Sequence, residues 1–224
     1  MQNQSDQIVW RDGDIPVSTL FDDPFFSLED GVAETSHVFL AGNDLPARFC
    51  AGFQIAELGF GTGLNLLVVW DAWTRSGQDG PLQFTSFEAF PMAPADMARA
   101  HQAFPAFDGK RDLLGRVWRG QGGRIDLPGL TLDVVIGDAR QTLPQWQGAA
   151  DAWFLDGFSP AKNPELWSPE LMGEVGRHTV AGGSAATYTA AGFVRRGLAD
   201  AGFDVTRVAG YGRKRHMTRA GMPQ

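Results

Sequence analysis

Residues 57–65 read Glu57-Leu58-Gly59-Phe60-Gly61-Thr62-Gly63-Leu64-Asn65 and continue an apolar run that begins at Phe53. Three alternate glycines between a strand and a helix let the backbone turn tightly and approach a ligand with no Cβ in the way. Glycine-rich turns also occur without ligands, so the motif gains meaning only from its neighbours. Its G-x-G-x-G spacing differs from the G-x-G-x-x-G fingerprint of dinucleotide-binding folds.

Glu57 stands two residues before the first glycine, where it would face the phosphate of a dinucleotide. A carboxylate there repels a pyrophosphate but attracts an ammonium group. The motif therefore favours a ligand with a nucleoside and a cationic amino-acid part over a nicotinamide dinucleotide.

From residue 52 onward, short apolar runs alternate with helical stretches. This alternation predicts an α/β fold with a doubly wound, mostly parallel sheet. We expect seven strands, the last two forming an antiparallel hairpin around Gly210-Tyr211-Gly212, with a further hairpin partner for the third strand near Val117. The predicted strands span 53–58, 83–88, 130–136, 152–155, 184–188, 205–208 and 216–219, and the predicted helices 64–75, 94–103, 169–178 and 191–201. Residues 1–50 are interpreted as an N-terminal extension packed on the core domain 51–224, with short strands in 8–49 and a helix at 34–41.

Four consecutive strands of this pattern end in acidic residues: Glu57, Glu88, Asp138 and Asp156. The carboxyl ends of parallel strands meet at one edge of the sheet, which is where open α/β folds bind ligands. Glu88 has the offset of a ribose-binding acid, although an ordinary strand-end carboxylate fits equally well. Asp138 suits an adenine amino group or, alternatively, the N-cap of a helix beginning at Ala139.

Asp156 opens the loop Asp156-Gly157-Phe158-Ser159-Pro160-Ala161-Lys162-Asn163-Pro164. Each proline fixes its own φ and restricts the residue before it, so this loop is stiff. The pattern sets a carboxylate at the edge of the sheet, with turn or helix capping as the open alternative.

Composition limits the classes of function. The single cysteine, Cys50, excludes an internal disulfide, and four scattered histidines give no metal-ligand spacing. No apolar run approaches membrane-spanning length and the N-terminus lacks signal-peptide features, so we expect a cytoplasmic protein. The net charge is −7, yet residues 195–219 are rich in arginine and lysine; this segment is either a local nucleic-acid footprint or a solvated face.

These residues together resemble the S-adenosylmethionine-dependent methyltransferases of class I, whose Rossmann-like fold begins with a motif like Glu57 to Gly63. The chain is similar in particular to the methyltransferase modules of the MnmC and MnmD type, which act on the tRNA wobble uridine. The similarity extends over nearly the whole chain. It is carried by the segments 21–27, 38–43, 57–65, 87–88, 137–139, 151–164, 189–196 and 210–215.

The resemblance implies methylation of the aminomethyl nitrogen of 5-aminomethyl-2-thiouridine at the tRNA wobble position, giving 5-methylaminomethyl-2-thiouridine. It implies S-adenosyl-L-methionine as cofactor and the tRNA anticodon arm as partner, with no membrane partner. MnmC itself has an FAD-dependent oxidase domain that removes a carboxymethyl group. We expect no FAD and no metal in this chain, and a separate FAD-dependent oxidase acting upstream.

Asp156 is the predicted catalytic residue, accepting a proton from the amine and orienting its nitrogen. Aromatic side chains are expected to wall the pocket and face the sulfonium, with core packing the favoured alternative for Phe60. The residues predicted to bind the cofactor are Glu57, Gly59, Phe60, Gly61, Gly63, Asn65, Glu88, Asp138, Asp156 and Phe158. Those predicted to bind substrate or tRNA are Phe26, Pro160, Lys162, Asn163, Arg195, Arg196, Arg213, Lys214 and Arg215.

Three other functions are compatible with the same residues. One is an N-methyltransferase for a small-molecule amine, and another is a non-catalytic module that binds S-adenosylmethionine. A nicotinamide dehydrogenase is disfavoured by Glu57 and by the glycine spacing.

Overall fold

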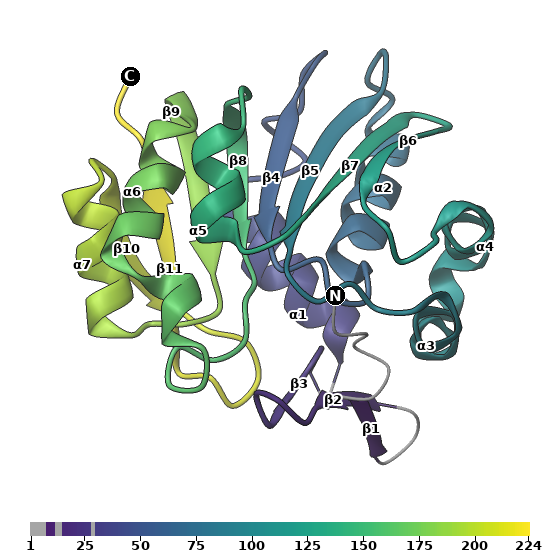
Figure 1. Ribbon diagram of the computed structural model, residues 1–224. Helices are drawn as coiled ribbons and strands as arrows, with labels where there is room; N and C mark the ends of the chain where they lie inside the picture. The colour runs from purple at the N-terminus through teal and green to yellow at the C-terminus, as the bar shows by residue number, and fades with distance from the viewer. Residues whose placement is uncertain (1–7, 12–14, 28–29) are drawn as a thin grey trace.

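A central sheet of eight strands, in the order β10-β11-β9-β8-β4-β5-β7-β6, organises the molecule (Figure 1). The computed structural model describes residues 8–11, 15–27 and 30–224. The sheet strands are β4 (Gln54–Leu58), β5 (Leu82–Glu88), β6 (Gly123–Leu127), β7 (Leu130–Ile136), β8 (Ala150–Leu155), β9 (Thr179–Thr187), β10 (Asp204–Ala209) and β11 (His216–Gly221). Neighbours from β9 through β8, β4 and β5 to β7 run parallel, whereas the β10–β11, β11–β9 and β6–β7 pairs are antiparallel.

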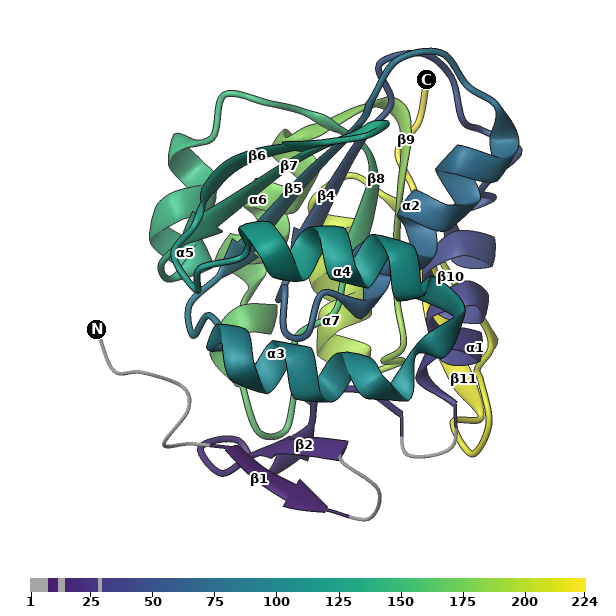
Figure 2. The ribbon, with the colours of Figure 1, turned by 90° about the vertical axis from the view of Figure 1, so that its right-hand side faces the viewer.

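Helices cover both faces of this sheet (Figures 1 and 2). One face carries α2 (Leu64–Ser76), α3 (Pro94–Ala100) and α4 (Asp108–Val117), and the other carries α5 (Ala139–Thr142), α6 (Pro169–Arg177) and α7 (Gly192–Asp200). Short 3-10 turns η4 (His101–Ala103), η5 (Pro105–Phe107), η6 (Leu143–Gln145) and η7 (Pro164–Trp167) connect them.

Period-two alternation in the central strands builds two separate cores. On β8, Phe154 packs with the core beneath α2, whereas Trp153 and Leu155 pack with the core beneath α6 and α7. All three are fully buried. Strands buried on both faces are typical of a parallel sheet between two helical layers, which is why residues 152–155 of β8 are all apolar.

The fold class predicted from the sequence is confirmed, with one additional strand. β6 pairs antiparallel with β7 at the sheet edge, so the hairpin partner of β7 lies at 123–127 and not near Val117. Residues 108–117 instead form helix α4, which the sequence pattern did not reveal, whereas the short helix α5 begins at Ala139, where the sequence offered Asp138 as an N-cap. Leu114 anchors α4 in the core, while the side chains of β6 are mostly exposed and give little apolar alternation to recognise.

Residues ahead of β4 form a small antiparallel sheet and a helical segment. The sheet contains β1 (Ile8–Arg11), β2 (Ile15–Ser18) and β3 (Asp23–Pro24), and the helical segment contains α1 (Gly31–Thr35), the π-helical turn η2 (Ser36–Leu40) and η3 (Ala41–Asn43). Val38 and Phe39 belong to the same buried cluster as α2. The division of the chain at residue 50 into an extension and a domain stays a prediction.

The small sheet lies below the carboxyl ends of the central strands (Figure 1). From β4, the chain adds β5 and then β7 on one side of the sheet. It then returns to the other side of β4, where it adds β8 and β9. Such a reversal of strand order opens a crevice at the carboxyl ends of the strands. The N-terminal segment therefore covers the part of the sheet at which a ligand site is expected.

Asn43 ties the N-terminal segment to the sheet. Its Nδ2 donates to the carbonyl oxygens of Phe39 (2.9 Å) and Trp153 (3.3 Å), and its Oδ1 accepts from Ser184 Oγ (2.6 Å). The side chain is completely buried.

Replacing Asn43 with alanine is expected to lower the free energy of unfolding by about 1–3 kcal/mol, because buried polar groups lose their partners. Urea unfolding followed by circular dichroism measures this change. Gln147→Ala, at an exposed position, serves as the control and should change stability by less than about 0.5 kcal/mol. Equal stability of the two variants would contradict the role assigned to Asn43.

Candidate active site

A cavity of about 850 Å³ lies at the carboxyl ends of β4, β5, β7 and β8. It is lined by the glycine loop after β4, by Glu88 and Asp156 at the ends of β5 and β8, and by residues 20–21 and 23–27 of the N-terminal segment. Elements distant in the sequence thus enclose one space, as the ligand-binding edge of a doubly wound sheet requires.

The glycine loop passes so close to the neighbouring strand that side chains are excluded. Gly59 has φ +91°, and a Cβ built on it would lie 2.6 Å from the carbonyl oxygen of Asp156. Gly61 and Gly63 also have positive φ, and Gly63 is the N-cap of α2. The backbone itself therefore forms the cavity wall, as expected for a loop that approaches a ligand.

Glu88 holds this loop in place. Its Oε2 accepts from the Gly61 N–H (2.9 Å) and its Oε1 accepts from the Phe90 N–H (2.7 Å). Burial raises the pKa of Glu88, and these backbone donors act in the opposite direction. Glu88 lines the cavity, so its contact with a ribose stays a prediction alongside this structural role.

Asn65 bridges the two central carboxylates of the site. Its Nδ2 donates to Glu57 Oε1 (2.9 Å) and to Asp156 Oδ2 (2.6 Å), and its Oδ1 accepts from Thr35 Oγ1 (2.8 Å). Both amide hydrogens are used in this way. Asp156 and Asn65 line the cavity, whereas Glu57 is buried and is not among the lining residues.

Burial makes both carboxylates weak acids. Desolvation raises the pKa of Glu57 from 4.5 to about 8, against the opposing hydrogen bonds from Ser86 and Asn65. It also raises the pKa of Asp156 from 3.8 to about 7, opposed by the hydrogen bond from Asn65. Glu57 is therefore neutral at pH 7, and Asp156 is poised between its two protonation states. A contact between Glu57 and a cofactor ammonium stays a prediction.

Asp138 is the N-cap of α5, the alternative that the sequence left open. Its Oδ1 accepts from the Arg140 N–H at 2.9 Å, and its carboxylate also pairs with the Arg140 guanidinium. The hydrogen bond from Arg140 lowers the pKa of Asp138. Asp138 borders the cavity, and its predicted contact with an adenine stays untested.

Aromatic rings form much of the cavity wall. Phe158 stacks on Phe21 with ring centroids 4.7 Å apart and meets Phe25 edge-on at 5.2 Å. Phe26 packs against Phe104, and Phe60 packs against Trp118. Phe60 combines core burial with a place in the cavity lining.

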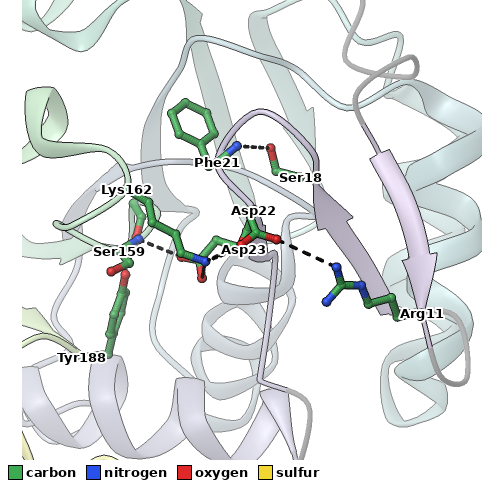
Figure 3. A network of polar contacts seen from close by, with 9 residues as sticks. Arg11, Ser18, Phe21, Asp22, Asp23, Ser159, Lys162 and Tyr188 are labelled. Carbon is green, nitrogen blue, oxygen red and sulfur yellow. Dashed lines mark hydrogen bonds and ion pairs between the residues drawn. The ribbon is translucent and has the colours of Figure 1, made fainter.

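Lys162, predicted to contact RNA, forms a hydrogen bond and ion pairs with residues of the N-terminal segment (Figure 3). Its Nζ donates to the carbonyl oxygen of Asp22 and lies 3.2 Å from the Asp22 carboxylate and 3.8 Å from that of Asp23. Asp23 Oδ2 also accepts from the Ser159 N–H at 2.8 Å. The 159–162 loop and residues 22–23 are thereby joined beside the cavity, which Asp23 and Ser159 line.

A second polar cluster surrounds Tyr188, next to the loop that begins at Asp156. Tyr188 Oη donates to the Gly157 carbonyl oxygen (2.7 Å), and Lys214 Nζ lies 4.0 Å from the centroid of the Tyr188 ring. Lys214 Nζ also donates to Glu34 Oε1 at 2.7 Å. Burial raises the pKa of Tyr188 well above its usual value, so the phenol is neutral.

The remaining predicted substrate residues occupy different positions. Arg213 and Asn163 line the cavity, whereas Pro160 is buried in the loop after Asp156. Arg196 and Arg215 are exposed and Arg195 is half-buried. The loop between β10 and β11 lies at the same end of the molecule as β1–β3 (Figure 1), which places several basic residues near the cavity mouth.

Most of the N-terminal contribution to the site was not predicted from the sequence. Asp23, Glu34 and Thr35 line the cavity with Phe21 and Tyr188, and of this wall only Phe26 was predicted. The available signal was the cluster of three phenylalanines and two aspartates at 21–26. This cluster lacks the apolar–polar alternation of a strand, so a role other than strand formation was indicated.

Membrane-spanning and metal-binding features are absent from the described parts of the chain. Within residues 8–11, 15–27 and 30–224, no helix is long and apolar enough to cross a membrane. The same ranges contain no group of three or more histidine, cysteine, aspartate or glutamate residues arranged to hold a metal ion.

A family model described as S-adenosyl-L-methionine-dependent methyltransferase matches residues 112–223, which is half of the chain. The match begins within α4 and includes Asp138 and Asp156, two of the four strand-end acids.

Curated relatives carry the description tRNA 5-methylaminomethyl-2-thiouridine biosynthesis bifunctional protein MnmC. The protein from Caulobacter vibrioides is 44% identical over 96% of this chain and 38% of its own length. The protein from Chromobacterium violaceum is 43% identical over 97% of this chain and 34% of its own length. The chain thus spans less than two fifths of these relatives.

Solved structures support the same fold. The crystal structure of MnmC2 from Aquifex aeolicus aligns with a TM-score of 0.76 at 26% identity, over 97% of this chain and 72% of that one. Spermidine synthase from Thermotoga maritima aligns with a TM-score of 0.56 at 13% identity, over 96% of this chain and 71% of that one, and shares the fold alone.

The weak acidity of Glu57 predicts a pH dependence of stability. Glu57 stays protonated in the folded protein up to about pH 8, but in the unfolded chain it ionises above about pH 4.5. The unfolded state therefore binds fewer protons in this window, and the free energy of unfolding falls as pH rises, by up to about 1.4 kcal/mol per pH unit for this group.

Glu57→Gln, which mimics the protonated acid, should make this decline between pH 5 and pH 8 shallower. Urea unfolding at several pH values measures the slope, and the exposed Glu170→Gln on α6 should keep that of the wild type. An unchanged slope in Glu57→Gln would show that this carboxyl group titrates normally.

Proposed function

We propose a function for this chain from the premise that it belongs to the family of S-adenosyl-L-methionine-dependent methyltransferases: it methylates the aminomethyl nitrogen of 5-aminomethyl-2-thiouridine at the tRNA wobble position. The observation that carries the proposal is Asp156, a carboxylate with a pKa raised to about 7 in a cavity that combines acidic and aromatic walls. The names of the relatives support the tRNA substrate.

The cavity suits the proposed cofactor. The positive-φ glycines leave room for close approach along one side, and Glu88 retains acceptor capacity beside them. Phe158, Phe25 and Phe26 give aromatic faces and edges, and aromatic faces attract cations. Bound S-adenosyl-L-methionine would supply an electrophilic methyl group on a sulfonium sulfur.

Acidic side chains around the cavity fit an amine as the acceptor. Asp23, Glu34 and Asp156 line it together, and they favour the entry of an ammonium over that of an anion. An alkylamine has a pKa near that of lysine, about 10, so it arrives protonated and has no lone pair for attack.

Asp156 is placed to remove that proton. Its raised pKa brings it closer to that of the amine than an ordinary aspartate, which makes proton transfer less unfavourable. Glu57 is neutral near pH 7, so Asp156 ionises next to an uncharged neighbour. The aromatic wall and the ion pairs of Lys162 with Asp22 and Asp23 would limit the access of water. The fixed orientation of the nitrogen and the methyl group would contribute more to the rate than the strength of the base.

Basic residues at the cavity mouth would position the tRNA. Contacts from Arg196, Arg213 and Arg215 to phosphates hold RNA without reading its sequence, and an unstacked wobble base would enter the cavity. A separate FAD-dependent oxidase would act before this chain where the wobble uridine carries a carboxymethyl group. Methylation of a small-molecule amine is the alternative that the experiment below excludes or supports.

The decisive experiment uses S-adenosyl-L-methionine with a deuterated methyl group and tRNA whose wobble uridine carries the aminomethyl substituent. After digestion, nucleoside mass spectrometry should show one labelled methyl group on that uridine. No label in tRNA, with label on an added alkylamine, would favour the small-molecule alternative.

Asp156→Asn should lower the methyl-transfer rate by roughly 10²–10⁴, the usual contribution of a general base. Binding of S-adenosyl-L-methionine, measured by calorimetry, should change far less than the rate. The exposed Asp112→Asn on α4 is the matched control. Full activity of Asp156→Asn would remove this residue from the proton transfer.

Affinity for tRNA should fall steeply with salt concentration if basic residues contact phosphates. Replacing Arg196 or Arg215 with alanine should weaken binding and make the logarithmic salt slope shallower by about one for each phosphate that the variant no longer neutralises. Filter binding at several salt concentrations measures both quantities. Arg75→Ala at the far end of α2 is the control, and slopes identical to that of Arg75→Ala would exclude the two arginines from the interface.

A further inference from the structure

The carboxylate of Asp156 is held by a chain of hydrogen bonds that begins in the N-terminal segment. Thr35 on α1 donates to Asn65 on α2, and Asn65 donates to Asp156 after β8. The three residues lie on separate elements, 30 and 91 positions apart along the chain at the two contacts. Local structure around Asp156 therefore does not determine the orientation of its side chain by itself.

The chemistry of these partners fixes the orientation of the Asn65 amide. Two carboxylate oxygens face Nδ2, and carboxylates accept hydrogen bonds. Were the amide turned around, its oxygen would face Asp156 Oδ2 at 2.6 Å, and the two would repel each other whenever Asp156 is ionised, the form that accepts the proton. The Thr35 hydroxyl supplies the donor that Asn65 Oδ1 needs on the opposite side.

Water does not compete effectively for the Thr35–Asn65 and Asn65–Glu57 bonds, whereas the Asn65–Asp156 bond at the cavity is partly buried. Thr35 is 4% exposed, Asn65 is 5% exposed and Glu57 is 1% exposed. Hydrogen bonds are electrostatically stronger in such surroundings, and a missing partner there is costly. The Thr35 hydroxyl thus satisfies its hydrogen-bonding need through Asn65, as buried polar groups generally require.

We propose that Thr35 and Asn65 are positioning residues for Asp156, with the hydroxyl orienting the amide and the amide orienting the carboxylate oxygen that remains for the amine. The inference rests on the proposed function in one respect, the role of Asp156 as proton acceptor. It also assigns a part of the catalytic geometry to α1, which precedes the methyltransferase core.

Several other charged or titratable groups influence Asp156. They are Glu57 on β4, Glu34 on α1, Tyr188 after β9 and Lys214 in the connection between β10 and β11. The variants below leave all four unchanged, so a shift in titration reports on the Thr35–Asn65 chain.

Thr35→Val replaces the hydroxyl with a methyl group of similar volume. We expect kcat for methyl transfer to fall by about two- to tenfold, the effect of one hydrogen bond, with little change in KM for S-adenosyl-L-methionine. Because donation from Asn65 opposes the raised pKa of Asp156, weakening it should move the acidic limb of the pH–rate profile to higher pH. Asn65→Leu should move that limb further in the same direction.

Thr35→Ser keeps the hydroxyl and should restore both kcat and the profile. Ser36→Ala is the matched control, because the Ser36 hydroxyl donates within its own helical segment to Val32 O and does not reach Asp156. If Thr35→Val is less stable but retains the wild-type profile, the residue is merely structural and the inference is wrong.

Carboxyl titration by NMR with ¹³C-labelled aspartate gives a readout that needs no turnover. The Asp156 signal, identified by its loss in Asp156→Asn, should titrate at higher pH in Thr35→Val than in the wild type or Thr35→Ser. If the wild type fails to methylate tRNA, the proposed function fails while this titration still tests the positioning. Identical titration in all three proteins would overturn the inference.

Discussion

The site depends on one buried amide that separates two carboxylates. Asn65 donates to Glu57 and Asp156 at once, and burial leaves both acids reluctant to ionise. Without those donors, two carboxyl groups at the end of adjacent strands would compete for a single proton in a low dielectric. Burial keeps Glu57 neutral near pH 7 against the donation from Asn65, while the same donation favours the charged form of Asp156.

The parallel sheet provides this arrangement through its topology. β4 and β8 are neighbours although nearly a hundred residues separate them, so Glu57 and Asp156 meet at the point where strand order reverses. The glycine loop must pass beneath Asp156, which explains why Gly59 tolerates no side chain. The N-terminal segment is joined to the site by the ion pairs of Lys162 with Asp22 and Asp23 (Figure 3) and by the hydrogen bond from Thr35 to Asn65. Positioning, exclusion of water and charge balance therefore come from four different parts of the chain.

The sequence predicted the elements whose signals are local. Alternating apolar runs located the parallel strands, and the strand-end acids Glu88 and Asp156 were correctly placed at one edge. Contacts between distant segments could not be predicted in this way. Lys162 pairs with Asp22 and Asp23 and Lys214 pairs with Glu34, contacts that no local pattern indicates, and the contacts of both lysines with phosphates stay predictions. Helix α4 was missed because its apolar face is narrow, with Leu114 as its one fully buried side chain.

Hydrogen exchange measured by mass spectrometry tests most directly whether this edge of the sheet is the binding site. Adding S-adenosyl-L-methionine should slow amide exchange in the glycine loop at 59–63 and in the loop at 156–163, because both lose solvent when the cavity is filled. Exchange at the outer strand β6 should not change, since that hairpin lies apart from the cavity lining. Protection confined to other segments, with 59–63 exchanging as in the free protein, would contradict the account.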